Sequence, residues 1–383
     1  MKKKAFLFAV VFCLLALTPA PLTAQNKVQT KTVDGVTHIL NPAKPLNGTF
    51  EIEVERTREI NPYDQPDVGL RMIMIARDRD GEVILFDPNG AEAHRFAPDG
   101  RYLGLLTKKG QGPGEFSPMQ GYHVGFDPAN IWVFGGRKEA QFDRQGRLIM
   151  DRAISHYFDG GVDGGRFITV DVRRTEKKDQ IRTLKLITLA ADGAETALDL
   201  LQAENIGMIR NADGQRGFAD GWGTPNFSYV ADAAAKLVYC GLNTEYRIQV
   251  RDYSGKTLRV IEKAYEPIKA RKSDVERMMS WALNDERMKW EIAAYPDRFI
   301  AITNLAVLPK GHLAVFRVSG AEKFEIDVFS PQGECLYALI PPKDVKMDDA
   351  VFFDTGFATI EQAGDYSVYR EYRIKNLPAV FGD

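Results

Sequence analysis

The sequence predicts an all-β protein, a six-bladed β-propeller with a short helical insertion and a ring closed by an N-terminal strand. Three observations support this fold class. Five turns carry a glycine after a polar or turn-forming residue, and short apolar strands flank each turn. The first three of these glycines recur about every 46 residues, the length of a four-stranded blade. The chain of 383 residues also exceeds the usual size of a single core, which favours a repeat array or several domains.

Residues 1–24 have the three parts of a secretory signal peptide. Lysines 2–4 form the positive region, residues 5–17 form an uncharged apolar run, and Ala24 is the expected last residue before cleavage. The alternative, a retained membrane anchor, is disfavoured because the run is too short to cross a bilayer. Cys13 lacks the preceding residues that a lipoprotein site needs. We therefore expect a periplasmic or extracellular protein with no stable membrane span after cleavage.

Composition narrows the function classes. The chain has 50 Lys and Arg against 52 Asp and Glu, and loss of the leader lysines makes the mature chain slightly more acidic. This balance argues against a nucleic-acid-binding surface. We also expect the protein to be a monomer. Cys240 and Cys335 fall in different expected blades, in no spacing typical of zinc ligands. Two buried free thiols are favoured, although export leaves a disulfide open.

The strands follow from the turns, whose glycines are Gly100, Gly146, Gly193, Gly255 and Gly333. Hairpin turns of this kind need a positive φ, which glycine adopts without steric cost. The expected strands, blade by blade, are 83–86, 91–96 and 102–106; 122–126, 131–134, 140–142 and 148–150; 166–172, 183–189 and 196–200; 227–230, 237–240, 246–250 and 258–261; 301–307, 313–318, 324–329 and 336–340; 350–353, 357–360 and 366–374.

The sixth blade lacks a fourth strand at the C-terminus, so the N-terminal part of the chain is expected to fill the slot. Residues 50–54 or the earlier 36–40 can do so, which would pair the chain ends and remove the open sheet edges. We divide the chain into the leader 1–24, a segment 25–49 that contributes a closing strand, and the propeller 50–383. A pair of β-sandwiches or a solenoid would be the other architectures with many short strands.

Two insertions explain the longer intervals between the later glycines. Residues 202–223 are polar and glycine-rich, and Trp222 among them could contact a ligand or pack against a neighbouring blade. Residues 271–298 are expected to contain a helix, because a capping box at 273–276 precedes apolar residues at helical spacing. This helix could be a lid or partner surface, or could simply pack on the blade edges.

Residues 108–116 read Lys-Lys-Gly-Gln-Gly-Pro-Gly-Glu-Phe. The glycines permit a sharp turn from one blade to the next, the proline stiffens it, and the phenylalanine can bury its ring between blades. A phosphate cradle is the alternative, but the Lys-Ser/Thr pair and the helix that such a loop needs are missing. The segment is therefore interpreted as a structural inter-blade motif, formed by Gly110, Gly112, Pro113, Gly114, Glu115 and Phe116.

The same nine residues resemble the inter-blade signature of NHL-repeat propellers. Residues 124–146 look like one NHL repeat, and residues 246–250 resemble a strand of that repeat. The opening at 33–36, with the prolines at 42 and 45, is similar to the start of exported bacterial six-bladed propellers of the NHL and TolB-like kind. The resemblance implies this fold and export. It also implies that some members with lyase activity hold a metal through several channel-facing histidines.

Candidate chemistry is sparse. Of five histidines, only His123 is expected on an innermost strand facing the channel, and one histidine does not make a metal site. We name His123, Arg137 and Trp222 as candidate ligand-binding residues and no catalytic residue. No cofactor is predicted, although calcium or zinc in the channel is left open. The glycine-rich segments 159–165 and 213–217 are interpreted as solvated loops.

These observations favour an exported binding or scaffold propeller that presents loops around a channel. Its partner could be a protein, a peptide or a small molecule. The alternative is a metal-dependent enzyme of the lyase or esterase kind that uses the channel, and a third option is a structural component of the cell surface. The architecture alone does not decide among them, because propellers host many unrelated activities.

Overall fold

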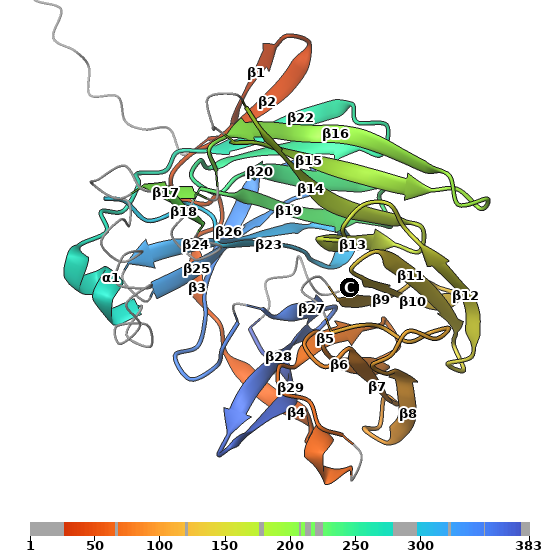
Figure 1. Cartoon of the computed structure of the whole chain (residues 1–383). Coiled ribbons are helices and arrows are strands. Elements are labelled where there is room, and N and C mark those ends of the chain that lie inside the picture. The colour runs from red at the N-terminus through yellow and green to blue at the C-terminus, as the bar shows by residue number, and fades with distance from the viewer. Residues whose placement is uncertain are drawn as a thin grey trace, which may run out of the picture.

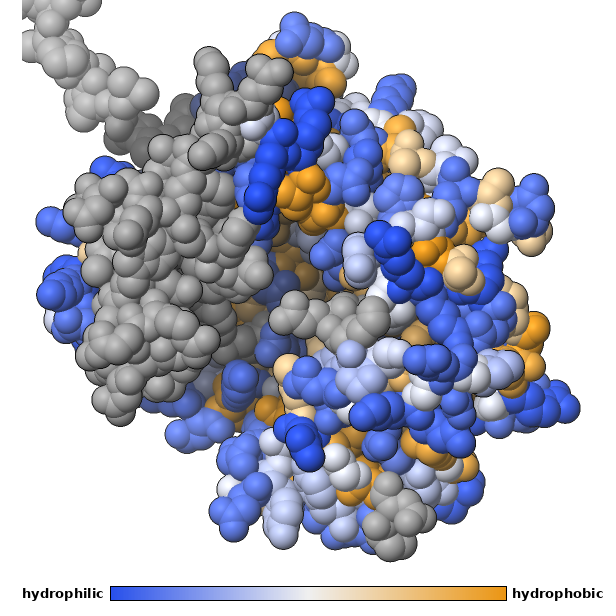
Figure 2. All heavy atoms as spheres, viewed as in Figure 1, coloured by the Kyte–Doolittle hydropathy of each residue, from blue (hydrophilic) through white to orange (hydrophobic). Residues whose placement is uncertain are grey.

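The computed structural model confirms the six-bladed β-propeller (Figure 1). It describes residues 27–65, 68–118, 122–175, 180–206, 208–210, 216–218, 225–278, 297–320, 323–347 and 349–376. Within these ranges no helix is long and apolar enough to span a bilayer. Figure 2 shows hydrophilic side chains over most of the visible described surface, with apolar residues scattered among them.

Each blade is a four-stranded antiparallel sheet, numbered here from the innermost strand outward. Blade 1 is β5 (Met74–Arg77), β6 (Val83–Asp87), β7 (Glu92–Phe96) and β8 (Tyr102–Thr107); blade 2 is β9 (His123–Phe126), β10 (Asn130–Gly135), β11 (Lys138–Asp143) and β12 (Leu148–Ala153); blade 3 is β13 (Gly160–Asp163), β14 (Arg166–Arg174), β15 (Gln180–Leu189) and β16 (Glu195–Glu204); blade 4 is β19 (Phe227–Asp232), β20 (Leu237–Leu242), β21 (Arg247–Asp252) and β22 (Thr257–Lys263); blade 5 is β23 (Asn304–Val307), β24 (Leu313–Gly320), β25 (Lys323–Phe329) and β26 (Cys335–Ile340); blade 6 is β27 (Val351–Phe353), β28 (Gly356–Ala363), β29 (Tyr366–Ile374) and β4 (Val54–Ile60).

The innermost strands form a closed ring, in which β5, β9, β13, β19, β23 and β27 each contact the next and β27 contacts β5. Six apolar cores lie between adjacent blades rather than inside one shared centre. Strand β6 shows why. Val83 and Leu85 face the core shared with blade 6, while Ile84 and Phe86 face the core shared with blade 2. The sequence of a strand that is buried on both faces is therefore a continuous run of apolar residues.

The chain closes the ring with β4, which pairs antiparallel with β29 so that Ile60 lies opposite Tyr369. An N-terminal strand therefore closes the propeller, but the two segments expected to do so were wrong. Strand β2 (Val36–Asn41) runs parallel to β22 on the outside of blade 4 and forms a hairpin with β1 (Gln29–Val33). Strand β3 (Thr49–Glu51) runs parallel to β26 on the outside of blade 5. The closing strand lies beyond residue 49.

The five glycine turns join the third and fourth strands of blades 1 to 5. All five glycines have φ between 84° and 99°, as the turn type requires. An aspartate often caps the same turn. In blade 2, Asp143 Oδ1 accepts hydrogen bonds from the backbone N–H groups of Gln145 at 3.0 Å and Arg147 at 2.8 Å. The repeat thus fixes both the backbone angle and the hydrogen bonds of its turn.

The interpretation of residues 159–165 as a loop was wrong, because β13 is the innermost strand of blade 3. Its glycines are required by close neighbours. A Cβ on Gly160 would lie 2.8 Å from the Tyr229 ring, and one on Gly161 would lie 2.3 Å from the Trp132 ring. Glycine in a strand here marks a close approach between blades rather than a turn.

Both insertions precede innermost strands. The first contains a hairpin of β17 (Met208–Arg210) and β18 (Arg216–Phe218) before β19. The second contains α1 (Lys272–Met278) before β23, which is the described part of the helix expected within 271–298. In α1 the buried Asp274 accepts hydrogen bonds from Arg271 at 2.7 Å and Arg277 at 2.8 Å. The remaining residues of this prediction, 279–296, lie outside the described ranges.

Candidate functional site at one mouth of the channel

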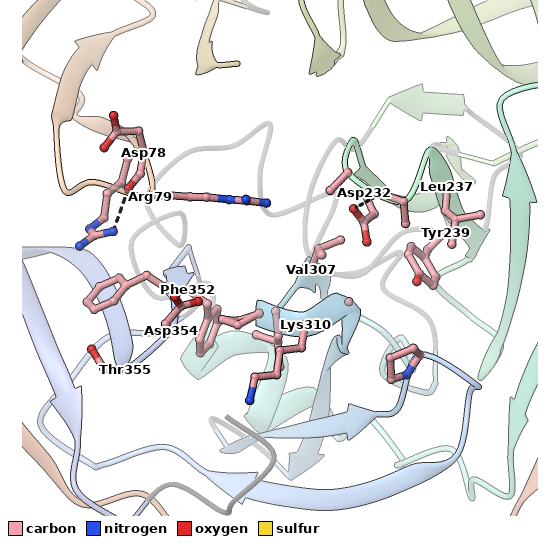
Figure 3. A pocket seen from close by; sticks show the side chains of 18 of the residues that line it. Asp78, Arg79, Asp232, Leu237, Tyr239, Val307, Lys310, Phe352, Asp354 and Thr355 are labelled. Atoms are coloured by element: carbon pink, nitrogen blue, oxygen red, sulfur yellow. Dashed lines mark hydrogen bonds between the residues drawn. The ribbon is translucent and has the colours of Figure 1, made fainter. Parts of the chain in front are cut away.

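A cavity of about 1030 Å³ lies where the innermost strands of blades 1, 4, 5 and 6 end. We call this opening the strand-end mouth, and the opposite opening the strand-start mouth. Blades 1 and 4 face each other across a ring of six, so the cavity spans the channel. Charged groups of both signs and aromatic rings line it (Figure 3), among them Arg77, Asp78, Arg79, Asp232, Tyr239, Arg259, Lys310, Phe352, Phe353, Asp354, Glu371 and Arg373.

The blade 1 wall is a tight turn that follows β5. The N–H of Glu82 donates to Asp78 Oδ1 at 2.7 Å, the N–H of Gly81 donates to the Asp78 carbonyl at 3.3 Å, and Arg144 of blade 2 also pairs with the Asp78 carboxylate. These bonds fix the turn and place Arg79 near its tip. Arg79 is exposed, and no described residue forms a hydrogen bond or an ion pair with its side chain. Its guanidinium is therefore available to a ligand.

A group of ion pairs supports this turn from blade 6. The buried carboxylate of Glu371 accepts hydrogen bonds from Arg58 at 3.1 Å, from Arg77 at 3.1 Å and from the Tyr369 hydroxyl at 2.5 Å. The Arg77 guanidinium also lies 3.9 Å from the centre of the Phe353 ring. Burial, and then the neighbouring Glu371 charge, raise the pKa of Tyr369. Since these groups satisfy one another, they give the wall rigidity.

The opposite wall, on blade 4, is built around Asp232. Its side chain is buried, and its Oδ1 accepts a hydrogen bond from the N–H of Ala235 at 2.9 Å, which holds the turn after β19. Burial, followed by the Asp232 charge, raises the pKa of the adjacent Tyr239. Figure 3 shows Arg79 extending into the cavity from one side and Asp232 on the other side. An arginine thus faces a carboxylate across the channel.

The turns that follow the innermost strands of the other two blades each add one charged side chain to the lining. On blade 5, Lys310 and Gly311 both have positive φ, at 59° and 75°, and such a conformation in a non-glycine residue is strained. On blade 6, Asp354 and Thr355 follow β27 and are exposed. In the order of blades 1, 6, 5 and 4, Arg79, Asp354, Lys310 and Asp232 of these turns therefore alternate in charge.

Other charged groups at this mouth have partners of their own. Arg373 forms an ion pair with Glu55 at 2.6 Å, and Arg259 donates to the carbonyl of Pro331 at 2.5 Å. Because these groups are engaged within the protein, they contribute shape and a fixed field rather than a free binding group. Arg79, Asp232 and Asp354 are the clearest candidates for direct contact with a ligand.

His123 lies at the beginning of β9, and so at the strand-start mouth. Its ring stacks on Trp132 with 5.7 Å between ring centres, and it also contacts Phe86 and Phe158. Burial among these rings lowers the pKa of His123 to about 4, so the side chain is neutral at physiological pH. The histidine thus belongs to an aromatic cluster between blades 1, 2 and 3.

Arg137 lies in the turn between β10 and β11, which is also at the strand-start end of blade 2. Its guanidinium is 4.5 Å from the centre of the exposed Tyr157 ring. Neither His123 nor Arg137 lines the strand-end cavity. Trp222, the third candidate, lies outside the described residues.

The 108–116 motif connects β8 to β9 and is tied to both blades. The Phe116 ring is buried in the core between blades 1 and 2. Lys138 of blade 2 donates to the carbonyls of Gly112 and Glu115, both at 2.9 Å, and the N–H of Gly114 donates to Asp151 at 2.5 Å. The N–H of Gly112 donates a hydrogen bond to the Glu115 carboxylate. This bond is the largest of the effects that lower the pKa of Glu115. The motif's donors are therefore used within the protein.

Two observations in the described ranges concern metal ligands and thiols. No group of three or more His, Cys, Asp or Glu side chains there is placed to hold a metal ion. Cys240 and Cys335 are free and buried, and burial raises the pKa of each thiol to about 12. These cysteines are therefore protonated and shielded.

Sequence reasoning missed the residues of the cavity, although a signal was present. An aspartate stands at or directly after the end of the innermost strand in five blades, at Asp78, Asp127, Asp163, Asp232 and Asp354. Aspartate suits such positions because its carboxylate accepts hydrogen bonds from the following turn. Aligning the blades on this aspartate would have identified the loops that line the strand-end mouth.

Among known proteins, a solved structure with a TM-score of 0.50 supports the fold. No family model and no curated protein matches the chain. A solved structure of a DUF4221 family member from Bacteroides vulgatus aligns over 85% of this chain and 99% of its own, with 12% identity and a TM-score of 0.50. A Bacteroides fragilis protein named as exported aligns over 88% and 100%, with 10% identity and a TM-score of 0.48. Virginiamycin B lyase from Staphylococcus aureus aligns over 85% and 100%, with 10% identity and a TM-score of 0.37.

Proposed function

We propose that this protein is an exported binding propeller that holds a small, water-soluble ligand at the strand-end mouth. The observation that carries the proposal is a cavity of about 1030 Å³ to which four blades contribute and into which charged groups project from opposite walls. This volume lies at the upper end of the range typical of small-molecule sites. The leader-like segment at residues 1–24 supports export.

The construction of the walls suits binding. Hydrogen bonds and ion pairs within the protein already fix the turns that carry Arg79 and Asp232. A ligand that meets side chains on fixed turns loses less affinity to ordering of the site than one that meets mobile loops. Aromatic rings at Tyr239, Phe352 and Phe353 offer apolar surface beside the charges.

The proposal is tested by blocking the cavity without disturbing the core. Ala234 lines the cavity and Ala233 does not, yet both are exposed in the same turn. Thermal shifts would be recorded for wild type, Ala234→Trp and Ala233→Trp against short peptides, sugars, dicarboxylic acids and polyamines. We expect at least one class to stabilise wild type and Ala233→Trp, by about 2.7 kcal/mol at a hundredfold excess over Kd. The same compound should leave Ala234→Trp unshifted, and equal shifts in all three proteins would contradict the proposal.

A further inference from the structure

The facing walls of the cavity carry opposite charge. Blade 1 contributes the exposed guanidinium of Arg79, and blade 4 contributes the buried carboxylate of Asp232. We propose that the ligand is a zwitterion of the short-peptide class, whose carboxylate binds Arg79 and whose ammonium group binds Asp232. This inference rests on the proposed function, because it names the ligand class of the same cavity.

The Arg79 wall is suited to a carboxylate. A guanidinium presents several N–H donors in a planar fork that matches the two oxygens of a carboxylate. The neighbours of Arg79 are already satisfied, since Arg77 pairs with Glu371 and Asp78 pairs with Arg144. Arg79 therefore remains the guanidinium of this turn that has no partner among the described residues.

The Asp232 wall is suited to an ammonium group. A carboxylate can accept several hydrogen bonds, and Asp232 uses Oδ1 for the N–H of Ala235. Its other oxygen accepts no bond from a described residue and remains for a ligand donor. Because Asp232 is buried, its charge is screened less by water than a surface carboxylate would be.

The remaining walls disfavour ligands with charge of one sign. Asp354 on blade 6 lies beside the Arg79 wall, and Lys310 on blade 5 lies beside the Asp232 wall, so positive and negative groups alternate around the cavity. A polyanion or polycation would meet a like charge at every second wall, which costs affinity. A peptide carries one charge at each end and uncharged amides between them, and its side chains can pack on Phe352 and Tyr239.

The test uses trialanine with both ends free, N-acetyl-trialanine, and trialanine amide, with binding measured by calorimetry on the mature full-length protein. We expect each blocked peptide to bind wild type at least tenfold more weakly than the free peptide. Arg79→Gln should abolish the preference for a free carboxylate while keeping the preference for a free amine. Asp232→Asn keeps an oxygen that caps the turn and should abolish the preference for a free amine alone. Arg101→Gln and Asp365→Asn, exposed and outside the cavity, should behave as wild type.

Equal binding of free and blocked peptides, or an Arg79→Gln variant that weakens all three peptides equally, would overturn the inference. If Asp232→Asn unfolds at a lower temperature than wild type, the inference is judged by the binding of the three peptides to Arg79→Gln. Arg79 is exposed, and its loss leaves the core intact. If a sugar or a dicarboxylic acid binds in the Ala234→Trp screen and trialanine does not, the inference falls and the proposed function stands. If no compound binds, both fall.

Discussion

His123 is uncharged in the folded protein at neutral pH because of its surroundings. Three aromatic rings contact its half-buried side chain, and burial lowers its pKa to about 4, well below the value of 6.5 that applies in the unfolded chain. Between these two pH values the unfolded chain binds a proton that the folded chain does not. The free energy of unfolding therefore falls as the pH drops from 6.5 to 4, with a slope of up to about 1.4 kcal/mol per pH unit from this residue.

A His123→Phe variant isolates this effect, because phenylalanine keeps an aromatic ring against Trp132, Phe86 and Phe158. Urea unfolding of wild type and variant would be measured at intervals from pH 7 to pH 4. We expect the variant's free energy of unfolding to depend less steeply on pH in this window, so that the variant gains stability relative to wild type as the pH falls from 6.5 to 4. Parallel curves would show that His123 titrates normally in the folded protein.

At the scale of the element, the glycine turns can be separated into backbone and packing contributions. Gly193 and Gly146 both have positive φ, at 87° and 85°. A Cβ on Gly193 meets nothing within 4 Å, whereas one on Gly146 would lie 2.6 Å from Arg95, whose side chain is held by Glu82. We expect Gly193→Ala to cost about 1–2 kcal/mol from backbone conformation alone.

Gly146→Ala should cost clearly more, because Arg95 must move away from a buried ion pair whose loss is worth about 3 kcal/mol. Both variants would be compared with wild type by urea unfolding at neutral pH. Equal losses in the two variants would mean that Arg95 adjusts freely and that the turn is isolated from its neighbouring blade.

Some elements of this fold could be predicted from the sequence and others could not. The glycine turns were predicted because a positive φ singles out one residue type at a repeated interval. Strand β13 was not, because Gly160 and Gly161 resemble a loop until the Tyr229 and Trp132 rings beside them are known. Strand β4 was not, because its sequence is mostly polar and exposed and lacks the apolar alternation of an ordinary strand.

At the scale of the whole molecule, β4 is the strand on which ring closure depends. Without it β29 would have an open edge, and the buried Ile60 would be lost from the core between blades 6 and 1. We expect a mature chain beginning at Lys44, which lacks β1 and β2, to fold as a monomer with reduced stability. A chain beginning at Pro62, which also lacks β3 and β4, should aggregate or unfold without a cooperative transition.

Size-exclusion chromatography and thermal unfolding of the two truncated chains distinguish these outcomes. A cooperative, monomeric chain beginning at Pro62 would show that the ring does not need its N-terminal strand.

The candidate site belongs to this same scale. Arg79 and Asp232 are far apart in the sequence and face each other because blades 1 and 4 stand opposite in a ring of six. No local pattern contains that relation, so single-sequence reasoning directed attention to His123, Arg137 and Trp222 instead. The number of blades could be counted from the turns, but the residues that meet across the channel depend on the order and direction of every innermost strand.

The most direct test of the central claim is a crystal structure of the protein grown with the compound that gives the largest thermal shift. The account predicts ligand density at the strand-end mouth, between the Arg79 turn of blade 1 and the Asp232 turn of blade 4. Density at the strand-start mouth near His123 and Arg137, or on the outer edges of the blades, with the strand-end cavity holding only solvent, would contradict it.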